Sequence, residues 1–191
     1  MKADLFDIEE EWYPPSSLPD LTNCERISVD LETCDPNLLT LGPGWCRNDG
    51  YVIGFAVAAG DFVGYFPIRH QGGGNMPEKT VVNWLKKQLA TPHIEKIMHN
   101  AMYDLGWLRW AGIEVQGKII DTMVAAPLLN ENRRWYNLNS LAGGYLGGSY
   151  TPRSWASMRS RMLLLHCVCG IGCGLTSTRM KSAAYSSWRH H

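Results

Sequence analysis

The sequence of 191 residues contains no acidic residue after Glu131, although its formal net charge is zero. All 18 Asp and Glu residues lie in residues 1–131, where ten Lys and Arg leave a formal charge of −8. Residues 132–191 contain eight Lys and Arg, which give a formal charge of +8. A globular domain rarely extends for 60 residues without a carboxylate, so this asymmetry predicts that the two parts of the chain differ in kind.

Long apolar runs are also absent. The longest nearly apolar stretch, residues 162–175, has 14 residues and is too short for a membrane span. The chain begins with an acidic stretch, which argues against a secretory signal. The six cysteines do not have the spacing of a secreted disulfide framework, because three are scattered and three crowd near the end. We therefore expect a cytoplasmic protein without a membrane partner.

The hydrophobic pattern predicts three strands and a helix, followed by alternating strands and helices. The expected strands are residues 26–33, 51–58, 62–68, 94–99 and 115–120, and the expected helices are residues 77–89, 100–110 and 121–129, with a further one starting at 137. Residues 35–50 are rich in Gly and Pro and predict a loop. This order predicts an α/β fold in which helices flank a mixed sheet.

Three carboxylates are candidates for chemistry. Asp30 and Glu32 are two residues apart on one expected strand, so both side chains project from the same face. Asp104 follows Asn100 by four residues, which places those two side chains on one face of a helix. Two like charges on a buried strand repel each other unless a cation offsets them. Carboxylates from two elements can hold two divalent cations.

Each of these residues also has a structural interpretation. The pair Asp30 and Glu32 could be a surface pair on an edge strand. Asn100 could be the N-cap of its helix, and Asp104 a solvated acid that the helix dipole favours. Asp121 is better explained as a helix cap than as a metal ligand.

Two stretches resemble the first two motifs of the DEDD 3′–5′ exonucleases. They are Val29-Asp30-Leu31-Glu32-Thr33 and His99-Asn100-Ala101-Met102-Tyr103-Asp104. The resemblance extends to residues 120–123, 136–141 and 145–147. Residues 42–45 and 65–70 are further similar to proofreading domains of phage family A DNA polymerases. The resemblance covers roughly residues 12–148 and implies a ribonuclease H-like fold.

The resemblance also implies a site. Asp30 would bridge two Mg²⁺ or Mn²⁺ ions, Glu32 would hold one of them, and Asp104 would hold the second. The substrate would be the 3′ end of single-stranded DNA, and a polymerase domain or subunit would be a partner. Thr33, Asn100, Tyr103 and Trp107 would contact the substrate, although Tyr103 and Trp107 could equally pack in the helix core. The resemblance places the protein in a bacterial or phage-infected cell.

The third family motif places a Tyr or His a few residues before a final metal-binding Asp. Because no acid follows Glu131, this Asp has no counterpart in the sequence. We expect an irregular lead-in over residues 1–20, a partial exonuclease domain over residues 21–148 that is incomplete at its C-terminal end, and an atypical tail over residues 149–191.

A shifted reading frame would explain this tail. Its His166-Cys167-x-Cys169 cluster with Cys173 lacks the paired spacing of a zinc site.

Three interpretations of the whole chain stay open: a truncated exonuclease, an inactive nucleic-acid-binding remnant without the final Asp, and a misfolded product without function.

Overall fold

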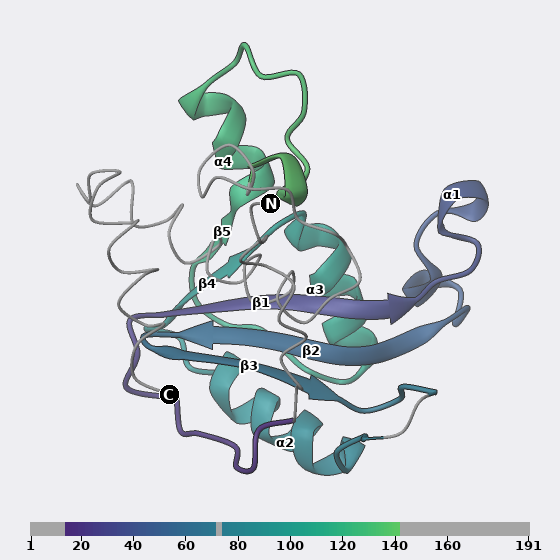
Figure 1. The fold of residues 1–191 in the computed structure, drawn as a ribbon, viewed down its shortest axis with the longest axis vertical. Helices are drawn as coiled ribbons and strands as arrows, with labels where there is room; N and C mark the ends of the chain where they lie inside the picture. Colours follow the sequence, from purple (N-terminus) through teal and green to yellow (C-terminus); the bar gives the residue numbers. More distant parts are fainter. Residues whose placement is uncertain (1–13, 72–73, 142–191) are drawn as a thin grey trace, which may run out of the picture.

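A computed structural model describes residues 14–71 and 74–141, which form a five-stranded mixed sheet with flanking helices (Figure 1). The strands are β1 (Arg26–Cys34), β2 (Tyr51–Ala59), β3 (Phe62–Pro67), β4 (Glu95–Met98) and β5 (Ile119–Asp121). The helices are α1 (Leu38–Leu41), the 3₁₀ turn η1 (Gly44–Cys46), α2 (Glu78–Leu89), α3 (Ala101–Trp110) and α4 (Thr122–Leu129). The spatial order is β3-β2-β1-β4-β5. The β1–β2 and β2–β3 pairs are antiparallel, whereas β1–β4 and β4–β5 are parallel, which confirms the expected mixed sheet.

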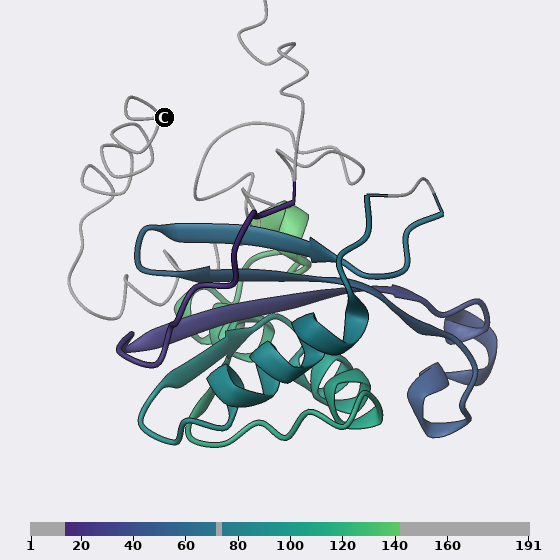
Figure 2. The ribbon, with the colours of Figure 1, turned by 90° about the horizontal axis from the view of Figure 1, so that it is seen from below.

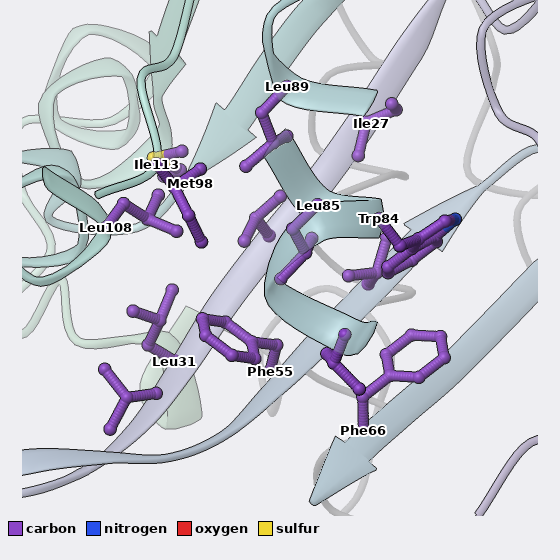
Figure 3. Packing of buried hydrophobic residues seen from close by; sticks show 14 of the residues in the cluster. Ile27, Leu31, Phe55, Phe66, Trp84, Leu85, Leu89, Met98, Leu108 and Ile113 are labelled. Atoms are coloured by element: carbon purple, nitrogen blue, oxygen red, sulfur yellow. The ribbon is translucent and has the colours of Figure 1, made fainter. Parts of the chain in front are cut away.

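The core lies between one face of this sheet and the helices α2 and α3, which share that side (Figure 2). Alternate residues of β1 point into it, namely Ile27, Val29 and Leu31. Along α2, Leu85 and Leu89 are spaced one turn apart and are completely buried, so a single apolar stripe of the helix packs on the sheet. Figure 3 shows these leucines packed beside residues from the strands and from α3.

The connection from β1 to β2 is more ordered than the loop that the sequence predicts for residues 35–50. It contains α1 and η1, and side chains hold both in place. The Asp35 carboxylate accepts a hydrogen bond from the backbone N–H of Gly44 at 2.9 Å. The Arg47 guanidinium donates to the Gly42 carbonyl at 2.9 Å and pairs with Asp49 at 3.1 Å. These side-chain contacts replace the hydrogen bonds that a strand or a long helix would supply.

The strand expected over residues 115–120 is wrong over its first four residues, because β5 begins only at Ile119. Gly117 has a φ of +86°, which a strand residue does not adopt. A Cβ at this position would lie 2.2 Å from the Pro92 carbonyl oxygen, so the backbones pack in direct contact there. The chain therefore turns at Gly117 before it joins the sheet.

The helix expected from residue 137 begins with helical residues 138–141, at the end of the described part. The resemblance at residues 145–147, the tail over residues 149–191 and its cysteine cluster lie outside the described residues, as do residues 1–13. No helix built from residues 14–71 and 74–141 is long and apolar enough to cross a membrane.

Candidate active site

Strand β1 positions Asp30 and Glu32 on the face opposite the α2 core. Asp30 lies opposite Ala56 of β2, and Glu32 lies opposite Gly54, so the register is regular across both residues. A β-bulge follows between Glu32 and Thr33. Because two residues separate the acids in a regular stretch, both carboxylates leave the same face of the sheet, as the sequence predicts. Asp30 is buried and Glu32 is half-buried.

Helix α3 begins with an unusual turn at Asn100, which has a φ of +64° in the left-handed region. Asn100 occupies the N-cap position, but its side chain makes no cap hydrogen bond. The cap comes instead from Asp121 at the end of β5. Its carboxylate accepts hydrogen bonds from the backbone N–H groups of Asn100 at 3.0 Å and Ala101 at 2.8 Å. The exposed Asn100 side chain is therefore not used to start the helix.

Asp121 also caps the next helix, α4, because it accepts a hydrogen bond from the backbone N–H of Met123 at 2.9 Å. The prediction that Asp121 caps the helix that follows it is confirmed. Its hydrogen bonds to the start of α3 could not be predicted from the sequence. The neighbouring Thr122 hydroxyl donates to the Met98 carbonyl at 3.1 Å and lies 2.9 Å from Nδ1 of His99. This hydrogen-bonded group ties the start of α3 to the start of α4.

Strand β1 and helix α3 bring Asp30 and Asp104 to one hollow of about 410 Å³. Both side chains are buried, with exposed fractions of 7% and 3%, and they are the buried acids among the described residues. The rest of the lining comes from β1, from α3 and its N-terminal turn, and from the chain after α4: Leu31, His99, Asn100, Tyr103, Met123, Asn137, Leu138 and Asn139. Two buried carboxylates in one hollow repel each other, which favours a cation between them.

Glu32 does not line this hollow. Within residues 14–71 and 74–141, no three His, Cys, Asp or Glu side chains converge into a group that could hold an ion by themselves. The donor set is thus two carboxylates, with a third nearby on the same strand face. Mg²⁺ fits such a set, because it commonly takes one or two carboxylates and completes its shell with water and phosphate oxygens.

A second hollow of about 510 Å³ adjoins the first, since Asn100 and Tyr103 line both. It contains the predicted substrate residue Thr33 and has largely apolar walls, formed by Leu38, Pro43, Trp45 and Met102. The Tyr103 hydroxyl lies 2.8 Å from the Thr33 hydroxyl and donates to the Asp35 carboxylate at 3.1 Å. Burial raises the pKa of Tyr103 above its ordinary value of 10, so the phenol keeps its proton.

Trp107 lines neither hollow, and its contact with substrate stays a prediction. Its side chain is completely buried in the core, which agrees with the alternative packing role. Trp45, whose ring lies against Gly106 of α3, was not among the predicted site residues. A Cβ at Gly106 would lie 2.2 Å from that ring, so a glycine inside an expected helix was the available signal for this contact.

Comparisons with known proteins agree with this arrangement. A family model described as 3′-5′ exonuclease matches residues 16–163, which extends past residue 148. The DNA-directed DNA polymerase of Pseudomonas phage M6 is 36% identical over 149 residues, covering 74% of this chain and 22% of the polymerase. DNA polymerase I of Chloroflexus aurantiacus is 39% identical over 83 residues, covering 43% of this chain and 9% of that protein. The chain thus spans less than a quarter of the length of these relatives.

Solved structures confirm the ribonuclease H-like fold. Brucella melitensis NrnC with bound Mg²⁺ gives a TM-score of 0.54 at 19% identity, covering 80% of this chain and 73% of that one. The POL domain of Pol1 from M. smegmatis, in complex with DNA primer-template and dNTP, gives a TM-score of 0.56 at 22% identity. That match covers 79% of this chain and 24% of the Pol1 chain.

Proposed function

Because this chain belongs to the 3′-5′ exonuclease family of DNA polymerases, we propose that it hydrolyses phosphodiester bonds at DNA 3′ ends, as in polymerase proofreading. The observation that carries the proposal is the pairing of Asp30 and Asp104. They come from a strand and a helix, both are buried, and both line one hollow. Two buried like charges in one hollow are expensive to maintain, which favours a functional role for them.

Asp30, Glu32 and Asp104 are the proposed ligands of two divalent cations, Mg²⁺ or Mn²⁺. Asp30 and Asp104 would hold the ions from the hollow, and Glu32 would add a ligand from the same strand face as Asp30. When bound, such ions supply a hydroxide nucleophile and neutralise the charge that develops on the phosphate and the leaving 3′ oxygen. The NrnC structure with Mg²⁺ supports this choice of ion.

The adjoining hollow would receive the 3′ end of single-stranded DNA. Thr33, Asn100 and Tyr103 supply polar groups there, and apolar walls suit the faces of a base. The bond between Thr33 and Tyr103 fixes the phenol at the junction of the two hollows. A terminal nucleotide in this position would place its scissile phosphate toward Asp30 and Asp104. A polymerase domain is the proposed partner, because the polymerase relatives are several times longer than the match.

A second candidate function follows from the acid-free segment after Glu131. In this alternative the final metal-binding Asp of the family is missing, so the chain would bind nucleic acid without cleaving it. In this alternative the hollows would still hold a 3′ end, and the basic residues after Glu131 would contact phosphates.

Degradation of a 5′-labelled single-stranded DNA by the purified chain separates the two candidates. The proposal expects a ladder shortened from the 3′ end with Mg²⁺ or Mn²⁺, lost with EDTA and in Asp30→Ala, and kept in Asp61→Ala. Asp61 is a suitable control because it is an exposed acid in the turn between β2 and β3. Retained DNA binding without any ladder, from a folded chain, would contradict the enzyme and support the binding remnant.

A further inference from the structure

The phenol of Tyr65 lies over Gly54, the residue of β2 that is directly opposite Glu32. An ideal Cβ at Gly54 would lie 2.2 Å from the Tyr65 hydroxyl oxygen, so the phenol fills the space that a side chain at Gly54 would occupy. Gly54 is the residue directly opposite Glu32 in the antiparallel pair of β1 and β2. Directly opposite side chains start about 5 Å apart, so the Tyr65 hydroxyl lies within reach of the Glu32 carboxylate.

The register supports this placement independently. Tyr65 on β3 is paired with Ala56 on β2, and Ala56 is paired with Asp30 on β1. These three residues form one row on the face that carries both acids. The small Ala56 and Gly54 leave room for the Tyr65 ring, which is 2% exposed. Tyr65 is thus a large side chain that extends over Gly54, on the face that carries both acids.

The imidazole of His70 contacts the phenol of Tyr65. Its Nε2 lies 2.5 Å from the Tyr65 hydroxyl, and its ring meets the phenol edge-on at 88°. Asn75 fixes the His70 backbone from both sides, because its side chain accepts from the His70 N–H at 2.7 Å and donates to the His70 carbonyl at 2.8 Å.

We propose that Tyr65 and His70 are positioning residues for Glu32. The Tyr65 hydroxyl donates to the Glu32 carboxylate, and Nε2–H of His70 donates to the phenol oxygen. A phenol has a single proton, so this order requires the Nε2–H tautomer of His70. The inference rests on the proposed function, which assigns Glu32 as a metal ligand. Outer donors of this kind orient ligating carboxylates, and their loss commonly weakens metal binding by about 10-fold or more.

The test uses the full chain and the variant Tyr65→Phe, which keeps the ring over Gly54 and removes the hydroxyl. We expect the Mn²⁺ dissociation constant, measured by calorimetry, to rise about 10-fold. We expect kcat on single-stranded DNA to fall while KM stays unchanged, because the phenol does not touch the DNA. Tyr51→Phe is the matched control, since it removes a hydroxyl at the start of β2, opposite Cys34. Thermal unfolding of both variants checks that each is folded.

His70 supplies the second arm. His70→Ala should weaken Mn²⁺ binding, whereas His70→Gln should retain it, because the Gln side-chain amide can donate to the phenol. The double variant Tyr65→Phe with His70→Ala should bind no more weakly than Tyr65→Phe, since His70 acts through the phenol. Nitrogen-15 NMR of the His70 ring should show the Nε2–H tautomer in the wild type.

Two results would overturn the inference while leaving the proposed function intact. One is wild-type Mn²⁺ affinity in a folded Tyr65→Phe, with Asp30→Ala losing it. The other is a protonated Nδ1 and an unprotonated Nε2 on His70, which would mean that the phenol donates to the imidazole. Failure of the wild type itself to bind Mn²⁺ would instead overturn the proposed function and the inference together.

Discussion

At the scale of single residues, Asp30 and Asp104 are two buried like charges, whose cost the proposed cation would offset. Replacing Asp104 by Asn removes one of two buried like charges, so without divalent ions the unfolding temperature should stay the same or rise. Excess Mg²⁺ should stabilise the wild type, by about 2.7 kcal/mol at one hundred times the dissociation constant, and leave Asp104→Asn unchanged. Thermal unfolding with and without Mg²⁺ measures both effects.

Asp61→Asn is the matched control, because it changes the same chemical group at an exposed turn. It should respond to Mg²⁺ as the wild type does. An equal response of Asp104→Asn would show that the ion binds elsewhere.

The contact between Trp45 and Gly106 gives a second residue-scale prediction. Alanine favours a helix over glycine by about 1 kcal/mol, so Gly106→Ala in an isolated helix would be stabilising. Here the added methyl would meet the Trp45 ring at 2.2 Å, and overpacking of this kind costs about 1–3 kcal/mol. Urea denaturation should therefore show a less stable Gly106→Ala.

The variant Asn83→Ala on the exposed face of α2 is the control for helix propensity, and it should be neutral or slightly stabilising. A Gly106→Ala chain that gains stability as well would contradict the packing of Trp45 on α3.

The sequence could predict that Asp30 and Glu32 lie on one face of the sheet, but it could not predict contacts between distant parts of the chain. Asp30 and Glu32 share a face because strand alternation is local. Lys96 could not be placed in the same way. It is completely buried, and its ammonium donates to the Gln116 carbonyl at 2.6 Å and to the Thr91 carbonyl. The two carbonyls that accept from Lys96 belong to residues 91 and 116, which precede β4 and β5, and no local pattern of β4 encodes this arrangement.

At the scale of the elements, Asp121 couples two helices. It caps α4 through Met123 and holds the first turn of α3 through Asn100 and Ala101. One lost cap costs about 0.5–2 kcal/mol, so Asp121→Ala should lose about 2 kcal/mol or more in urea denaturation. The matched Asp61→Ala should stay within about 0.5 kcal/mol of the wild type, as surface substitutions commonly do. Equal stability of both variants would contradict the double cap.

The segment before β1 is tied to α2 by Asp20, which gives a prediction of pH dependence. Hydrogen bonds from Thr22 and then Lys87 lower the pKa of Asp20 from its ordinary value of 3.8 to about 2. A lowered carboxyl pKa contributes stability above pH 3.8 that is lost as the pH falls toward 2. Asp20→Asn should therefore lose less stability than the wild type over that pH range, in denaturation followed by circular dichroism. Identical slopes would contradict the tether.

The strands and long helices could be predicted because their apolar spacing is regular over several residues. Two segments could not. Residues 35–50 gain their order from Asp35 and Arg47, whose partners lie several residues away on the loop. Residues 115–118 leave the strand pattern because Gly117 packs against the backbone of Pro92. In both cases contacts outside the local pattern determine the conformation.

At the scale of the whole molecule, the described sheet and helices hold two of the three proposed ligands in one hollow, while the sequence after Glu131 contains no further acid. The family match nevertheless extends to residue 163. The boundary of the exonuclease domain at residue 148 therefore stays a prediction, as does the frame-shifted origin of the tail.

The proposed function is hydrolysis at a DNA 3′ end by the carboxylates of β1 and α3. Mass spectrometry of the products released from single-stranded DNA in H₂¹⁸O with Mg²⁺ tests it. Water attack at phosphorus breaks the bond to the 3′ oxygen of the preceding nucleotide, so we expect nucleoside 5′-monophosphates that carry one ¹⁸O. Asp30→Asn should release none. A folded wild type that releases no monophosphate, or an Asp30→Asn chain that releases as much as the wild type, would contradict the proposed function.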